Sequence, residues 1–177
     1  MSVTTSYRRL PKAEFARLQN DSQYAEEYFG WELEDDDFDD WSDQRRQSGR
    51  WLNIHKAGPG LHFLLTGDAD MKSNTVAVPL SYMTVGGTDT EWPATYGMVS
   101  YLPPEQVREV VAALLEVREP ELRARYDPTA FNAERIYPGG DQWDERGIDE
   151  LLEALHQVTE FFGLAAQAGD VVLISND

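Results

Sequence analysis

The sequence contains no cysteine. This absence excludes disulfide bonds, thiolate-ligated zinc, iron–sulfur clusters and cysteine nucleophiles. Because secreted domains often depend on disulfides, a chain without cysteine fits a cytoplasmic protein, and we expect that location.

Long apolar runs are also missing. No segment approaches the roughly 20 apolar residues that a membrane-spanning helix needs, and the N-terminus, MSVTTSYRRLPKAEF, has no apolar stretch typical of a signal peptide. We therefore expect neither a membrane anchor nor a signal peptide. With 41% hydrophobic residues among 177, the chain is still long enough to bury a core, and we predict a single domain over residues 1–177.

Positive charge is scarce, because 15 lysine and arginine residues face 32 acidic ones and the net charge is −17. Nucleic-acid binding depends largely on cationic contacts with phosphates, so we expect no nucleic-acid partner. An acidic surface can instead attract a basic protein partner. The basic residues form only small clusters, at Arg8-Arg9, at Arg45-Arg46 with Arg50, and at Arg123 with Arg125.

The motifs of common enzyme classes are absent as well. There is no glycine-rich phosphate loop, no His-Glu-x-x-His and no Gly-x-Ser-x-Gly. The acidic run WELEDDDFDDWSD, at 31–43, lacks the glycine and terminal glutamate of an EF-hand loop. We interpret it as a solvated loop held by its aromatic residues, with a cation site or a docking surface for a basic partner as the alternative. We predict no cofactor, no metal site and no catalytic residue.

Apolar periodicity and turn signals predict strands interleaved with helices. Strands are expected at 2–9, at 96–102 and in the closing GDVVLISND, whose apolar run is typical of a buried strand. One helix is expected to begin at Pro11, and a second to end at about Phe29. Further helices are expected over 103–115, 119–127 and 148–165. The segment 43–66 also looks helical, and the segment 67–95 is rich in loops. This order predicts an α+β fold (α/β in the broad sense), with a small mixed sheet packed against several helices.

The stretch WLNIHKAGPGLHFLLTG, Trp51 to Gly67, holds two of the three histidines. If 51–66 formed one helix, Trp51, His55 and His62 would fall on a single polar stripe, as in the lining of a pocket. His55 and His62 would lie roughly 10 Å apart along the axis, too far to share one metal ion or to form a catalytic pair.

The Gly-Pro-Gly at 58–60 opposes a continuous helix, because an internal proline costs ~3 kcal/mol and each glycine ~1 kcal/mol more. A break here, with Pro59 opening a new turn, is the alternative, and LHFLL at 61–65 then also fits a strand. Under a break the histidine stripe dissolves, and each histidine becomes a core or edge residue.

Several segments resemble the YfbM-like family, a group of bacterial proteins of unknown function. They are LHFLLTG at 61–67, YGMVSYLPPEQVREVVAAL at 96–114, IYPGGDQW at 136–143 and AAQAGDVVLI at 165–174. The resemblance implies an α/β fold in the broad sense, with the stretch Trp51 to Gly67 as a helix, and implies no reaction or catalytic residue. Pro59 departs from the family pattern, in which the helix continues without proline.

Three functions remain open. The first is a non-enzymatic binding or interaction module for a protein partner, favoured by the charge and by the lack of catalytic motifs. The second is an enzyme or small-molecule binder with a pocket beside the histidine stripe. Its candidate residues are Trp51, His55, His62 and Asp68, joined by Tyr137 and Trp143 from the later turn. A structural or oligomer-forming role is a third possibility, for which the sequence indicates no subunit number.

Overall fold

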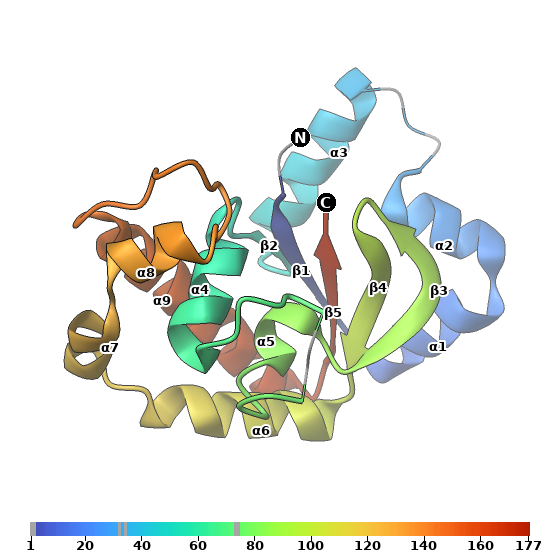
Figure 1. Cartoon of the computed structure of the whole chain (residues 1–177). Coiled ribbons are helices and arrows are strands. Elements are labelled where there is room, and N and C mark those ends of the chain that lie inside the picture. Colours follow the sequence, from blue (N-terminus) through green and yellow to red (C-terminus); the bar gives the residue numbers. More distant parts are fainter. Residues whose placement is uncertain (1–2, 32, 34, 73–74) are drawn as a thin grey trace.

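The computed structural model describes residues 3–31, 33, 35–72 and 75–177 (Figure 1). Its strands are β1 (Thr5–Leu10), β2 (Trp51–Asn53), β3 (Thr88–Ala94), β4 (Gly97–Leu102) and β5 (Val171–Asn176). Its helices are α1 (Lys12–Asn20), α2 (Ser22–Phe29), α3 (Asp35–Gln47), α4 (Ala57–Thr66), α5 (Tyr82–Val85), α6 (Pro104–Glu116), α7 (Glu119–Arg125), α8 (Pro128–Ala133) and α9 (Gly147–Ala168).

The strands form one sheet in the order β2-β1-β5-β4-β3, with the first and last strands of the chain side by side. β1 and β5 pair along their whole length, from Thr5 opposite Asn176 to Leu10 opposite Val171. The predicted α+β fold is confirmed. The prediction of a mixed sheet is wrong, because every pairing between the described strands is antiparallel. The two-residue link between β3 and β4 permits only that direction.

Helices cover both faces of the sheet, as Figure 1 shows. Val172 and Ile174 of β5 join the core formed with α4, α6 and α9. Val171 and Leu173 point the other way, into the core formed with α1 and α2. Because alternate residues of a strand face opposite sides, a strand covered on both faces must be apolar throughout. The prediction that this uninterrupted apolar run forms a buried strand is therefore confirmed.

The helix ends follow local signals in the sequence. Asp21 caps α2 by accepting a hydrogen bond from the Tyr24 backbone N–H, and Gly30 ends this helix in the left-handed conformation. The Asp127 side chain likewise accepts from the Thr129 N–H at the start of α8. The helices predicted over 103–115, 119–127 and 148–165 are present as α6, α7 and α9.

Two segments predicted as loops contain regular structure. The acidic run at 31–43 largely belongs to α3, whose last turn carries Arg45 and Arg46, where positive charge complements the helix dipole; Glu32 and Glu34 lie outside the described residues. The loop-rich segment 67–95 ends in β3, a mostly exposed edge strand that tolerates Pro93 and a register shift. Neither segment shows clear apolar periodicity in the sequence.

The helix predicted over 51–66 is wrong in its first half. Trp51–Asn53 is strand β2, which pairs with β1 and places Trp51 opposite Arg8. The helix begins only at Ala57 and runs unbroken through Gly58, Pro59 and Gly60 to Thr66. The break predicted at 58–60 is therefore absent, and Pro59 is the third residue of the helix rather than the first residue of a new turn. Proline is tolerated there because the first-turn N–H groups of a helix have no intrahelical acceptor.

The two glycines beside Pro59 are required by packing. A Cβ atom on Gly58 would overlap the Thr5 side chain on β1. A Cβ atom on Gly60 would lie 2.5 Å from the Trp143 ring and 2.9 Å from Leu151. Gly-Pro-Gly therefore lets the first turn of α4 pack closely between the sheet, α9 and the loop that carries Trp143.

We expect Gly60→Ala to lower the free energy of unfolding by about 1–3 kcal/mol, because the added methyl group overfills a packed core. Urea unfolding followed by circular dichroism measures the change. Gly163→Ala in α9 is the control, because a Cβ there meets nothing within 4 Å. We expect it to stabilise the protein by about 0.5–1 kcal/mol. Equal stability of the Gly60→Ala variant and the wild type would contradict the packing argument.

Candidate functional site

The six predicted site residues do not share one cavity. His55 and Trp143 line one groove, while Trp51 lines a separate cavity that is rich in arginine. His62 is buried in the core with 1% of its surface exposed. The predicted polar stripe therefore does not exist, because Trp51 lies on a strand, His55 in a turn and His62 on a helix.

His62 on α4 is held inside the protein by a hydrogen bond. Its Nδ1 atom lies 2.6 Å from the Thr84 hydroxyl, which is also buried. Burial lowers the pKa of His62 below its usual 6.5, and the charge of Asp68 opposes this effect. Asp68 is thus the one other predicted site residue whose charge affects the pKa of His62. A neutral, buried imidazole is suited to packing rather than to contact with a ligand.

His55 lies in the turn between β2 and α4. Its φ angle of 50° is in the left-handed region, and its backbone N–H donates to the Asn53 side chain at 2.6 Å. Its carbonyl accepts from the Thr5 N–H at 3.1 Å, which ties the turn to β1. The His55 side chain is exposed and makes no hydrogen bond or ion pair with the part of the chain that the structure describes.

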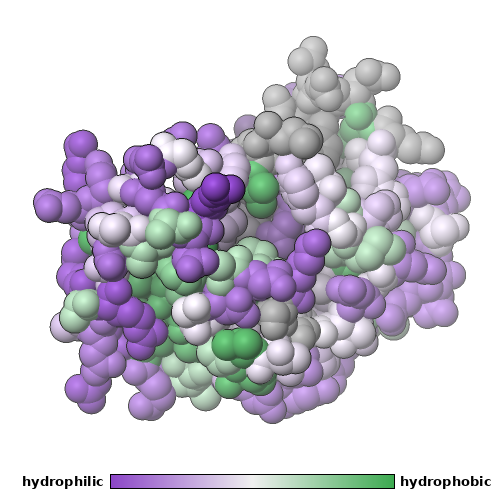
Figure 2. All heavy atoms as spheres, viewed as in Figure 1, coloured by the Kyte–Doolittle hydropathy of each residue, from purple (hydrophilic) through white to green (hydrophobic). Residues whose placement is uncertain are grey.

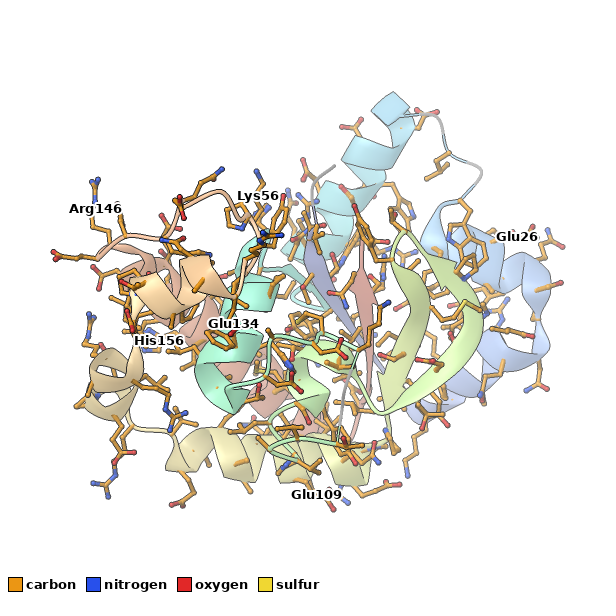
Figure 3. The ribbon with its side chains drawn as sticks, viewed as in Figure 1. Glu26, Lys56, Glu109, Glu134, Arg146 and His156 are labelled. Atoms are coloured by element: carbon orange, nitrogen blue, oxygen red, sulfur yellow. The ribbon has the colours of Figure 1, made fainter. Side chains whose placement is uncertain are left out.

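The groove beside His55 has a volume of about 830 Å³ and is open to solvent. Its walls are the turn 54–57, the loop 138–147 and the start of α9. Figure 3 places Lys56 and Arg146 along the same upper edge of the molecule. Tyr137 adjoins the groove through its neighbour Pro138, to which it is joined by a cis peptide bond.

Trp143 is a rigid part of this groove. Its backbone exchanges two hydrogen bonds with the Asn132 side chain, at 3.0 and 3.1 Å, and its indole N–H donates to the Ile136 carbonyl at 2.9 Å. The ring packs edge-on against Phe131, with 4.9 Å between centroids. A tryptophan held in this way presents a fixed apolar surface and loses little conformational freedom on binding.

Carboxylates outnumber cations in the groove. Asp144, Glu150 and Glu153 line it together with Lys56 and Arg146. Between residues 134 and 160 the chain has eight acidic residues and two arginines. Figure 2 shows a face on which hydrophilic residues surround small hydrophobic patches, consistent with the strongly acidic composition.

The second cavity, about 80 Å³ in volume, lies where β1, β2, α2 and the end of α3 meet. Four arginines line it, Arg8, Arg9, Arg45 and Arg50. They come from two of the three small basic clusters in the sequence, which the sheet and α3 bring together from 35 or more residues apart. Sequence spacing contains no sign of this convergence, although the clusters themselves were visible.

In the part of the chain that the structure describes, no three histidine or acidic side chains are grouped so that they could hold a metal ion. In the same ranges, no helix combines the length and apolar character needed to cross a bilayer.

Comparisons with known proteins identify the fold and leave the function open. A family model described as a domain of unknown function (DUF1877) matches residues 1–175. The chain is similar to the crystal structure of YfbM from Escherichia coli, a protein of unknown function, with a TM-score of 0.72 and 16% identity. That match covers 98% of this chain and 99% of the other. No curated protein matches. The resemblance to the YfbM-like family is confirmed.

The environment of His62 predicts a pH dependence of stability. Because the folded-state pKa is lowered, the unfolded chain binds more protons than the folded one once the pH falls below about 6.5. Stability should therefore decrease on acidification through this window, with a slope from this group of at most about 1.4 kcal/mol per pH unit. Chemical denaturation at a series of pH values measures the slope.

The matched variants are His62→Gln and His156→Gln. The His62 variant should lose part of the slope, whereas the variant of His156, whose side chain is 68% exposed, should keep it. If the two variants have the same slope as the wild type, His62 does not contribute to acid sensitivity.

Proposed function

The chain belongs to the DUF1877 family, and we propose that it is a non-enzymatic interaction module that binds a basic segment of a protein partner in the groove beside Trp143. The observation that carries the proposal is the groove itself, which combines a fixed indole with a surplus of carboxylates. Its volume of about 830 Å³ is within the usual range of binding pockets, roughly 300–1,000 Å³.

The charge of the protein supports a basic partner. A net charge of −17 attracts a cationic protein over several ångströms and accelerates the encounter. Inside the groove, Glu150 and Glu153 project from the first two turns of α9, where they can contact lysine or arginine side chains. Trp143 supplies the apolar anchor that interfaces commonly use.

The side-chain chemistry of the groove supports binding rather than catalysis. His55 is its only lining histidine in the described residues, and no described carboxylate or hydroxyl orients its ring. A histidine that acts as a general base is normally aligned by a second group. The cytoplasmic location and the partner class remain predictions from composition.

Titration with a lysine- and arginine-rich peptide tests the proposal by NMR and fluorescence anisotropy. We expect the indole N–H signal of Trp143 to shift. The double variant Glu150→Gln/Glu153→Gln should bind about fivefold more weakly, since each exposed ion pair is worth about 0.2–1 kcal/mol.

Glu109→Gln/Glu116→Gln on α6 is the matched control, because it makes the same change in net charge on exposed positions outside the groove. Long-range attraction therefore changes equally in the two variants, and only groove contacts distinguish them. Equal affinity of the two variants, or shifts confined to other surfaces, would exclude the groove as the binding site.

A further inference from the structure

The arginine cavity, lined by Arg8, Arg9, Arg45, Arg50 and Trp51 among others, is separate from the groove proposed above. Arg8 lies on β1, Arg45 in the last turn of α3, and Arg50 directly before β2. Four guanidinium groups thus gather in one small cavity of a protein whose acidic residues outnumber its basic ones by 32 to 15. Repulsion between them makes this arrangement unfavourable unless an anion offsets it.

Arg8 is buried without a direct carboxylate partner. Only 8% of its surface is exposed, and no described acidic oxygen lies within 4 Å of it. Its guanidinium donates one hydrogen bond, at 3.3 Å, to the Ser175 hydroxyl, and that hydroxyl donates to Asp177 at 2.9 Å. The Trp51 ring stacks on it, with 4.6 Å from the guanidinium carbon to the ring centroid.

Two buried donors at this cavity have no acceptor among the described residues. They are Nε of Arg8 and Nε1 of Trp51, which is 7% exposed. A buried donor left without an acceptor costs about 1–3 kcal/mol, and more when it is charged. Both residues line the same cavity, so an acceptor bound there lies beside two side chains whose buried N–H groups have no acceptor among the described residues.

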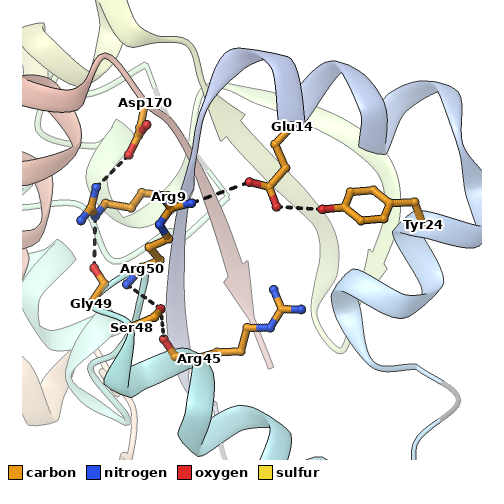
Figure 4. Close-up of polar contacts among 8 residues, drawn as sticks. All are labelled: Arg9, Glu14, Tyr24, Arg45, Ser48, Gly49, Arg50 and Asp170. Atoms are coloured by element: carbon orange, nitrogen blue, oxygen red, sulfur yellow. Dashed lines mark hydrogen bonds and ion pairs between the residues drawn. The ribbon is translucent and has the colours of Figure 1, made fainter.

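The remaining arginines differ in how far they are neutralised, as Figure 4 shows. Arg9 pairs with Asp170 at 2.8 Å, and Arg50 reaches Glu14 only at 3.8 Å. The guanidinium of Arg45 has no ion pair with a described residue and lies 5.0 Å from the Tyr28 ring centroid. With Arg9 paired to Asp170 and Arg50 to Glu14, the charges of Arg8 and Arg45 are left as a surplus of two.

We propose that this cavity binds a phosphate group, either free or carried on a small molecule. Guanidinium forks match the oxygens of phosphate, and a phosphate group carries about −1.5 to −2 charge near pH 7, which offsets the surplus of two. A volume of about 80 Å³ admits one such group, so any larger ligand extends outward past the exposed Ser48 and Arg50.

Titration of the full-length protein with inorganic phosphate, at constant ionic strength maintained with sodium chloride, tests the proposal. We expect saturable shifts of the Trp51 indole and arginine Nε–H signals in NMR spectra, and a higher melting temperature than in chloride alone. Glycerol phosphate is the second ligand. If it binds at least as tightly as phosphate, the group is carried on a small molecule; if phosphate alone binds, the ligand is the free ion.

Arg45→Gln should weaken phosphate binding about tenfold, the usual effect of losing a charged hydrogen bond. Arg17→Gln is the matched control, because Arg17 also stacks on a tyrosine, Tyr24, at 3.7 Å but lies outside the cavity. Both positions are on helices, and each change removes one contact between a guanidinium and a tyrosine ring. Failure of phosphate to exceed chloride, equal binding of acetate, or equal affinity of the two variants would overturn the proposal. None of these results bears on the basic-peptide groove.

Discussion

The pairing of β1 with β5 is the contact on which the rest of the structure depends. It joins the first and last strands over six residue pairs and places them at the centre of the sheet. β2 is added on the β1 side of this pair, and β4 and β3 are added on the β5 side. Both helical layers pack against the pair. Because the partners are more than 160 residues apart, their contact closes almost the whole chain into a loop, at a considerable cost in entropy. Burial on both faces of the sheet offsets that cost.

The same pair organises both candidate sites. Thr5 at one end of β1 contacts Gly58 and receives the turn that carries His55, so the groove is built against the edge of the strand. Arg8, three residues later, points to the opposite face from Tyr7 and enters the arginine cavity. Strand alternation thus places one residue in an aromatic core and its neighbour beside a charged cavity.

Positive and negative charges are unevenly distributed in this protein. The chain as a whole carries a net charge of −17. Two of the four arginines of the cavity are stacked on aromatic rings, with Arg8 over Trp51 and Arg45 over Tyr28. Cation–π contacts stabilise a buried guanidinium, but they supply no acceptor for its N–H groups. The cavity therefore combines positive charge with unused hydrogen-bonding capacity, which is the chemistry of an anion site.

The sequence by itself determined the elements whose signals are local. The helix α9 and the buried run of β5 were predicted from the sequence, because each signal depends on neighbours within a few residues. The family was also recognisable from short motifs such as LHFLLTG. The edge strand β3 was missed for the converse reason, because it is largely exposed and has no apolar alternation.

Only the tertiary structure decided the direction of the strands, the secondary structure of Trp51–Asn53 and which residues line each candidate site. Trp51 is in a strand because β1 provides a partner 43 residues away, a contact that no local pattern records. The glycines around Pro59 are explained by Thr5 and Trp143, which meet α4 only in the folded chain. His55 and His62, which the sequence suggested could share a pocket, lie in different environments, whereas arginines from two distant clusters line one cavity. A binding site depends on distances in space, and helical spacing predicts those distances only for residues that share one helix.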